Sequence, residues 1–201
     1  HATTPCDPRV RERVTSVSQT GFGNPSSPHL AGEAAQDLVE EARAQIAEHI
    51  GALPGEVVFT SGATESNNLV ILALVRGAIE RDSRRTRIVT SAIEHKSVLK
   101  AADAAASQYG VEHVTIPTSE RGIVDLSAAE ETIDEKTLLV SVQAVNNELG
   151  TKQPVEKLAD VAHEVGSLVH CDAAQALGRL GIDVEKWNVD FLSLSSHKAY
   201  G

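Results

Sequence analysis

Short β-branched runs alternate with helix-length segments from residue 56 to the end of the chain. Runs of this length, bounded by turn residues, are typical of strands, and the segments between them have the length and pattern of helices. The alternation predicts the α/β class, in three layers, with a mainly parallel sheet covered by helices on both faces. The predicted strands are 56–59, 87–90, 111–116, 138–142, 168–171 and 191–194, and the predicted helices between them are 65–80, 97–109, 126–133, 154–165 and 173–178.

Two helices are predicted before this alternation. In residues 7–17 the valines have helical spacing, and the loop at 21–28 then interrupts the pattern. A long amphipathic helix follows and ends near Gly51, because glycine favours the conformation that terminates a helix. Its predicted inward stripe consists of Ala34, Leu38, Ala42, Ile46 and Ile50.

Composition and charge narrow the class of protein. With 201 residues and 41% hydrophobic content, the chain can bury the core of an ordinary domain. A formal net charge of -10 provides no basic surface for a phosphate backbone, so we expect no direct nucleic-acid binding. We find no apolar run of membrane-spanning length and no signal-peptide pattern, so a cytoplasmic protein without membrane association is the default expectation. Cys6 and Cys171 are too few for a disulfide framework.

Both ends of the sequence suggest a piece of a longer chain. Residues His1–Pro5 begin without Met in a turn-like stretch, and the sequence stops soon after Lys198. We therefore expect residues 1–201 to form one incomplete large domain. Its N-terminal segment, residues 1–14, would pack with a smaller C-terminal domain that is absent from this sequence.

The candidate site begins with a turn of small residues. In parallel sheets, functional residues gather in the loops at the carboxyl ends of the strands. Residues 60–68 form such a loop, and they lead directly into a predicted helix. Free backbone N–H groups and the helix dipole would make this turn a phosphate cradle. An ordinary helix cap formed by Ser61 or Thr64 explains the same residues equally well.

Three further strand ends carry polar side chains. His95 lies in the loop after 87–90, where a lone histidine is more often a surface or capping residue than a catalyst. Asn147 follows the run 138–142 in a turn-like stretch. Asp172 directly follows an apolar strand, and Gln175 lies in the same loop. Because buried aspartates need a partner, we expect an arginine, a helix N-terminus or a protonated ring nitrogen near Asp172.

Lys198 completes this set of strand-end residues. It follows the predicted strand 191–194, and burial there would lower the pKa of its amine and favour Schiff-base formation. A cradle, an imidazole, amides, a carboxylate and a lysine are the groups that bind pyridoxal 5'-phosphate (PLP). In this interpretation Lys198 forms the imine, Asp172 keeps the pyridine nitrogen protonated, and residues 60–68 hold the phosphate. No metal site is expected.

The same stretches resemble those of a known family, the cysteine desulfurases. These enzymes belong to the class V aminotransferase group and have the PLP-dependent fold type I architecture. The resemblance runs through nearly all of the chain and implies that the predicted sheet is that of the fold type I large domain. The motifs that carry it, in order, are Thr60–Asn68, Glu94–Val98, Asn146–Gly150, Asp172–Gln175 and Ser195–Lys198.

The resemblance implies a role for each candidate residue. Lys198 would bind the cofactor and move protons on the substrate carbon, and His95 would stack on the cofactor ring and assist proton transfer. Asp172 would pair with the ring nitrogen. The other implied cofactor-binding residues are Ala63, Thr64, Ser195 and His197 at the phosphate, and Asn147 and Gln175 near the ring hydroxyl and the substrate.

The resemblance also implies a reaction. Sulfur would be taken from L-cysteine to leave L-alanine and a persulfide on an enzyme cysteine, in a homodimer that passes the sulfur to an acceptor protein for iron–sulfur clusters or thio-modification. In the family, the persulfide cysteine and a carboxylate-binding arginine lie beyond the lysine, so the 201 residues alone should not complete the reaction. Strand alternation turns Cys171 away from Asp172, and Cys6 lies in a proline-flanked segment; neither is favoured as the acceptor.

Two other interpretations stay open. Another class V PLP enzyme, such as a selenocysteine lyase, a kynureninase or an aminotransferase, would carry similar motifs. A non-catalytic scaffold domain would retain the fold, but it would have no physical reason to keep this set of polar strand-end residues.

Overall fold

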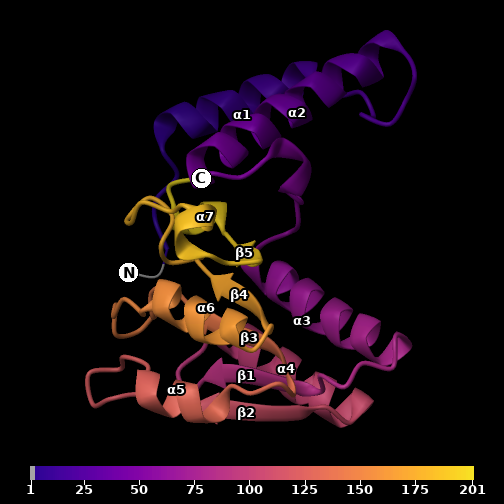
Figure 1. The fold of residues 1–201 in the computed structure, drawn as a ribbon. Coiled ribbons are helices and arrows are strands. Elements are labelled where there is room, and N and C mark those ends of the chain that lie inside the picture. Colours follow the sequence, from indigo (N-terminus) through magenta and orange to yellow (C-terminus); the bar gives the residue numbers. More distant parts are fainter. Residues whose placement is uncertain (1–2) are drawn as a thin grey trace.

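A computed structural model describes residues 3–201; residues 1–2 of the predicted N-terminal segment lie outside the described residues. The core is a five-stranded parallel sheet with the strand order β2-β1-β3-β4-β5 (Figure 1). The predicted α/β class with a parallel sheet is therefore confirmed. The strands are β1 (Arg87–Ser91), β2 (Glu112–Ile116), β3 (Thr137–Gln143), β4 (Leu168–Asp172) and β5 (Phe191–Ser193).

Helices cover both faces of this sheet, as the alternating pattern predicts. The α-helices are α1 (Pro8–Thr20), α2 (Leu30–Ile50), α3 (Ala63–Glu80), α4 (Lys96–Tyr109), α5 (Leu126–Thr132), α6 (Val155–Glu164) and α7 (Val184–Trp187). Ile88 of β1 packs in one hydrophobic core with α3 and α4, whereas the next residue, Val89, packs in a second core with α5 and α6. Because successive strand residues point to opposite faces, this split gives the expected three layers.

Helices α1 and α2 lie to one side of the three layers (Figure 1). Helix α1 has no buried residue, and Val14 is 58% exposed. In α2 the predicted stripe is only partly correct. Ile50 is buried, but Ala34 is exposed and the neighbouring Ala35 is buried in its place. Gly51 ends the helix in the left-handed conformation (φ 72°), as predicted. No helix among residues 3–201 is long and apolar enough to cross a membrane.

The predicted strand 56–59 is wrong. Residues Pro54–Glu56 form a 3₁₀ turn, and the stretch after it joins no strand in residues 3–201. Arg43 of α2 donates to the carbonyl of Val57, and its guanidinium lies 5.0 Å from the ring centre of Phe59. Val58 and Phe59 are 69% and 49% exposed. A β-branched run becomes a strand only where another strand lies beside it, which the sequence pattern does not reveal.

The predicted helix 173–178 is also wrong. These residues form successive turns, with the Ala176 N–H donating to the Ala173 carbonyl at 2.9 Å. Gly178 has a φ of 74°, a left-handed conformation that a regular helix does not contain. The short helix α7, capped by the Asp183 side chain, was not predicted.

The two ends of the described chain lie against each other. Thr4 donates through its backbone N–H and its hydroxyl to the His197 carbonyl, both at 3.3 Å, and accepts from the Tyr200 N–H at 2.7 Å. Asp7 N–H donates to the Tyr200 carbonyl at 2.9 Å. The N-terminal segment therefore holds the stretch that contains Lys198; its expected packing with a further domain stays a prediction.

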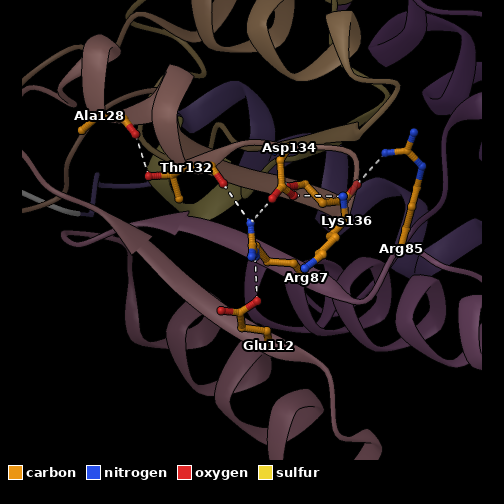
Figure 2. A network of polar contacts seen from close by, with 8 residues as sticks. Arg85, Arg87, Glu112, Ala128, Thr132, Asp134 and Lys136 are labelled. Carbon is orange, nitrogen blue, oxygen red and sulfur yellow. Dashed lines mark hydrogen bonds and ion pairs between the residues drawn. The ribbon is translucent and has the colours of Figure 1, made fainter.

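An arginine network ties the strands together at their amino ends (Figure 2). Arg87 of β1 bonds to Glu112 of β2 at 2.7 Å and to Asp134, just before β3, at 2.8 Å. Arg85 donates to the carbonyls of Thr137 at 2.9 Å and Val165 at 2.6 Å. The site described next lies at the opposite ends of the same strands.

Candidate active site

Four strands deliver the candidate residues to the carboxyl edge of the sheet. In the strand register, Asp172 of β4 lies beside Gln143 of β3 and Ser193 of β5. His95 lies in the loop after β1, Asn147 follows β3, and Ser195–Lys198 follow β5. Because the strands are parallel, their carboxyl ends meet at one edge of the sheet and bring these motifs to that edge.

Asp172 is buried, with 6% of its surface exposed. Its Oδ2 accepts from Nδ2 of Asn67 at 2.8 Å and its Oδ1 from the backbone N–H of Ala174 at 3.0 Å. Both donors are neutral, so neither supplies the positive charge that a buried carboxylate favours. A carboxylate held in this way suits a protonated ring nitrogen.

His95 is joined to Asp172 through two intervening side chains. It caps α4, and its Nδ1 accepts from the Ser97 N–H at 3.1 Å and lies 2.8 Å from Ser97 Oγ. Ser97 Oγ in turn accepts from Nδ2 of Asn67 at 2.9 Å. His95 is thus a capping residue, the ordinary role that the sequence suggested, and it also ends a buried chain of hydrogen bonds that leads to Asp172.

A second buried carboxylate, Glu94, was missed as a candidate. Its Oε1 accepts from Ser91 Oγ and from the Gln143 N–H at 3.0 Å, while its Oε2 is buried without a hydrogen-bond partner in the described chain. Burial, assisted by the nearby charge of Asp172, raises the pKa of Glu94 to about 8. Glu94 is therefore neutral over most of the physiological range. Its position beside His95 was visible in the sequence, but its burial depends on packing between β1 and β3.

The turn before α3 favours a cradle over a cap. Gly62 is the N-cap residue, with a φ of 151°, and no side chain of residues 3–201 caps the helix. The predicted caps Ser61 and Thr64 do not fill this role; both are exposed, and the Ser61 N–H donates to Glu65 Oε2 at 2.6 Å. The uncapped amides at the start of α3, from Ala63 and Thr64, are therefore available to an anion.

The amide side chains of the site have different surroundings. Asn147 is half-buried, whereas its neighbour Asn146 is buried and forms the turn, its Oδ1 accepting from the N–H groups of Glu148 and Leu149. Gln175 is 7% exposed, and Arg179 donates to its backbone carbonyl at 3.1 Å. Asn146 thus shapes the loop from which Asn147 projects.

The segment after β5 brings the last three candidates. Ser195 is buried, and its Oγ lies 2.9 Å from Nδ1 of His197. Lys198 is in the 3₁₀ turn Ser196–Lys198 and is half-buried, so the premise that it is a buried lysine is wrong for this chain. Its reactivity would have to come from the groups around it rather than from burial alone.

The two residues before Asp172 in β4 point to opposite faces of the sheet. His170 is fully buried, with Nδ1 2.8 Å from Ser141 Oγ and Nε2 2.9 Å from Ser193 Oγ, and burial lowers its pKa to about 4. Cys171 points into the other core, and burial raises the pKa of its thiol. A buried, protonated thiol facing away from Asp172 is a poor sulfur acceptor, as expected.

These residues fit PLP in three respects. The backbone N–H groups at the start of α3 are not bonded to a side-chain cap of the described residues. In the hydrogen bonds described above, Asp172 is bonded only to neutral donors. A lysine follows β5, the strand beside Asp172. The architecture matches the fold type I large domain of PLP enzymes, since the solved NifS-like protein superposes with a TM-score of 0.94 at 39% identity, over all of this chain and 54% of its own.

The family model of the class-V aminotransferases matches residues 1–201. The chain therefore belongs to the class-V aminotransferase family. Among curated relatives, the cysteine desulfurase IscS of Rickettsia felis is 43% identical over 201 residues, which are 100% of this chain and 48% of that protein. A mitosomal cysteine desulfurase of Trachipleistophora hominis is 42% identical over 204 residues, with 100% and 45% covered.

A further solved structure is similar to this chain. SspA, determined in complex with cysteine, superposes with a TM-score of 0.91 at 41% identity, over 100% of this chain and 56% of its own. The resemblance to cysteine desulfurases predicted from the sequence is thus confirmed. The chain spans about half the length of the curated relatives that it matches.

Proposed function

We propose that this chain is the PLP-binding part of a cysteine desulfurase, which takes sulfur from L-cysteine and leaves L-alanine. The observation that carries the proposal is the joining of the cradle helix, the Asp172 carboxylate and the His95 loop by one buried set of hydrogen bonds through Asn67. The identity of the relatives supports the reaction, and the complex of SspA with cysteine supports the substrate.

Each residue has a distinct task in this proposal. Lys198 would hold the cofactor covalently and move a proton at the substrate carbon, and Asp172 would keep a proton on the ring nitrogen. Bound PLP supplies an electron sink for the bonds around that carbon. The N–H groups of Ala63 and Thr64, with Ser195 and His197, would bind the phosphate. Asn147 and Gln175 would orient the ring hydroxyl and the substrate, and His95 would lie over the ring.

The sulfur-accepting step would need a further cysteine. Cys171 is buried in the core, and Cys6 is exposed near the N-terminus. We therefore predict that the 201 residues bind PLP but form little alanine from L-cysteine. The homodimer, the acceptor protein and the use of the sulfur in iron–sulfur clusters stay predictions from the resemblance. The cytoplasmic location stays a prediction from the sequence pattern.

A PLP titration followed by visible absorbance tests the proposal. We expect the wild-type chain to bind PLP in a saturable manner and to shift its absorbance, and Asp172→Asn to bind more weakly, because it loses the charge that faces the ring nitrogen. Arg76→Met, which removes an exposed ion pair on α3, serves as the control and should bind as the wild type does. Equal binding by the wild type and Asp172→Asn would contradict the assigned role of Asp172.

A further inference from the structure

Asn67 is a buried residue of this site to which no role has yet been assigned. The side chain is fully buried, one turn into α3 from the cradle, and the cofactor roles derived from the sequence do not include it. Its Nδ2 donates to Ser97 Oγ at 2.9 Å and to Asp172 Oδ2 at 2.8 Å. A single amide thus joins the helix that starts at the cradle, the strand that carries Asp172 and the helix that His95 caps.

The orientation of this amide is determined by its partners. If the amide were turned over, its oxygen would face the Asp172 carboxylate, and two acceptors would oppose each other. With Nδ2 toward Asp172, both amide hydrogens are used, and Oδ1 is left buried without a partner in the described chain. The amide thus directs one hydrogen at Asp172 and the other at Ser97.

The direction of the bonds extends to His95. Ser97 Oγ accepts from Asn67, so its own hydrogen is free to point at Nδ1 of His95, 2.8 Å away. The Ser97 backbone N–H also donates to that nitrogen, at 3.1 Å. A nitrogen that accepts two hydrogen bonds carries no proton, so the neutral ring has its hydrogen on Nε2.

We propose that Asn67 is a positioning residue that aligns the Asp172 carboxylate with one N–H and, through Ser97, fixes His95 as the tautomer that donates from Nε2. As far as the cofactor is concerned, this inference rests on the proposed function. Within it, His95 presents a hydrogen-bond donor to the ring and the substrate. The opposite nitrogen is occupied by Ser97, so His95 cannot take up a proton there without breaking these bonds.

Nitrogen NMR of the cofactor-free chain, labelled with ¹⁵N-histidine, tests the tautomer directly. The His95 signals are assigned by their loss in His95→Gln. We expect a protonated Nε2 and an unprotonated Nδ1 in the wild type. In Asn67→Leu and in Ser97→Ala we expect a measurable fraction of the tautomer with its proton on Nδ1, because the Ser97 backbone N–H is then the one fixed donor that remains to that nitrogen in the described contacts. Arg76→Met, which removes an exposed ion pair on the same helix, is the control and should keep the wild-type tautomer.

PLP affinity distinguishes the two parts of the proposal, the role of Asn67 at Asp172 and its role at His95. Asn67→Leu should bind PLP about tenfold more weakly, because Asp172 loses a charge-assisted hydrogen bond. Ser97→Ala should stay within about twofold of the wild type, since the Asn67–Asp172 bond remains. Near-ultraviolet circular dichroism establishes folding; if Asn67→Leu fails to fold, the tautomer in Ser97→Ala decides.

The two proposals can fail separately. A wild-type tautomer in both folded variants, or a proton on Nδ1 of the wild type, would overturn the role of Asn67 whatever the cofactor does. Absence of PLP binding by a wild-type chain with the expected tautomer would overturn the proposed function instead.

Discussion

At the residue scale, the site holds two buried carboxyl groups with different surroundings. Asp172 accepts hydrogen bonds at both oxygens, whereas Glu94 leaves Oε2 unpartnered and has a pKa of about 8. A neutral Glu94 can bridge β1 and β3 without placing a second negative charge beside Asp172.

Glu94 makes a testable contribution to the pH dependence of stability. Its pKa is raised from 4.5 to about 8, so between these values the unfolded chain has released a proton that the folded chain retains. The free energy of unfolding should therefore fall as pH rises through this window and level off above it. We expect Glu94→Gln to remove this component, on the order of a few kcal/mol between the two ends, as measured by urea unfolding across pH.

Asp134→Asn provides the comparison, because it changes a carboxylate whose pKa is lowered instead. The contribution of Asp134 to stability is present above the pKa of the unfolded chain and is lost as pH falls. Asp134→Asn should therefore keep the fall in the free energy of unfolding between pH 4.5 and about 8. An unchanged slope in Glu94→Gln would show that Glu94 is not the group responsible.

At the element scale, the arginine network at the amino ends of the strands should stabilise the sheet. Arg87 is largely buried and bonds to groups from β2 and from the stretch between α5 and β3. We expect Arg87→Met to lower the free energy of unfolding by about 1–3 kcal/mol, because it removes the charge-assisted hydrogen bonds of a largely buried guanidinium. Arg76→Met, which removes an exposed ion pair within α3, should change it by less than about 0.5 kcal/mol. Equal effects in denaturant unfolding would contradict this difference.

Gly62, which precedes α3, and Gly77, within α3, should respond oppositely to substitution by alanine. Gly62 has a φ of 151°, which side chains other than glycine rarely adopt, so Gly62→Ala should destabilise the protein by about 1–3 kcal/mol and weaken PLP binding. Gly77 lies within the helix with open space around it, so Gly77→Ala should stabilise by about 0.5–1 kcal/mol. Thermal unfolding of both variants measures the difference, and a stabilised Gly62→Ala would argue against the geometry of the cradle.

The accuracy of the sequence-based predictions differs between kinds of element for a physical reason. The runs that became β1, β3 and β4 are apolar because both faces of a parallel strand are buried, and this pattern is local. The run 56–59 looks the same, yet Val58 and Phe59 are exposed beside no strand of the described chain. Strand formation depends on a neighbour in space, and the pattern along the chain does not contain it.

The candidate site likewise contains residues that the sequence pattern reveals and residues that it does not. Asp172 and His95 could be found because each follows a strand, and the carboxyl ends of parallel strands meet. The sequence pattern does not reveal Asn67 and Glu94, because their place in the site comes from burial and from partners far along the chain. Asn67 and Asp172, for example, are separated by 105 positions in sequence. The half-buried Lys198 shows that a polar residue after a strand need not be enclosed.

At the scale of the whole molecule, the described chain brings its two ends together beside the site. The N-terminal segment bonds to the carbonyls of His197 and Tyr200, on either side of Lys198. These bonds attach the Lys198 segment to the N-terminal segment of the described chain. The chain spans about half the length of its curated relatives.

Lys198 is the residue that we propose to hold PLP. Borohydride reduction of the chain with PLP, followed by peptide mass spectrometry, tests it most directly, with Lys198→Ala and the exposed Lys100→Ala as a pair of variants. We predict a single stable PLP adduct on Lys198, which persists in Lys100→Ala and disappears in Lys198→Ala. An adduct spread over surface lysines, or none at Lys198, would contradict the account.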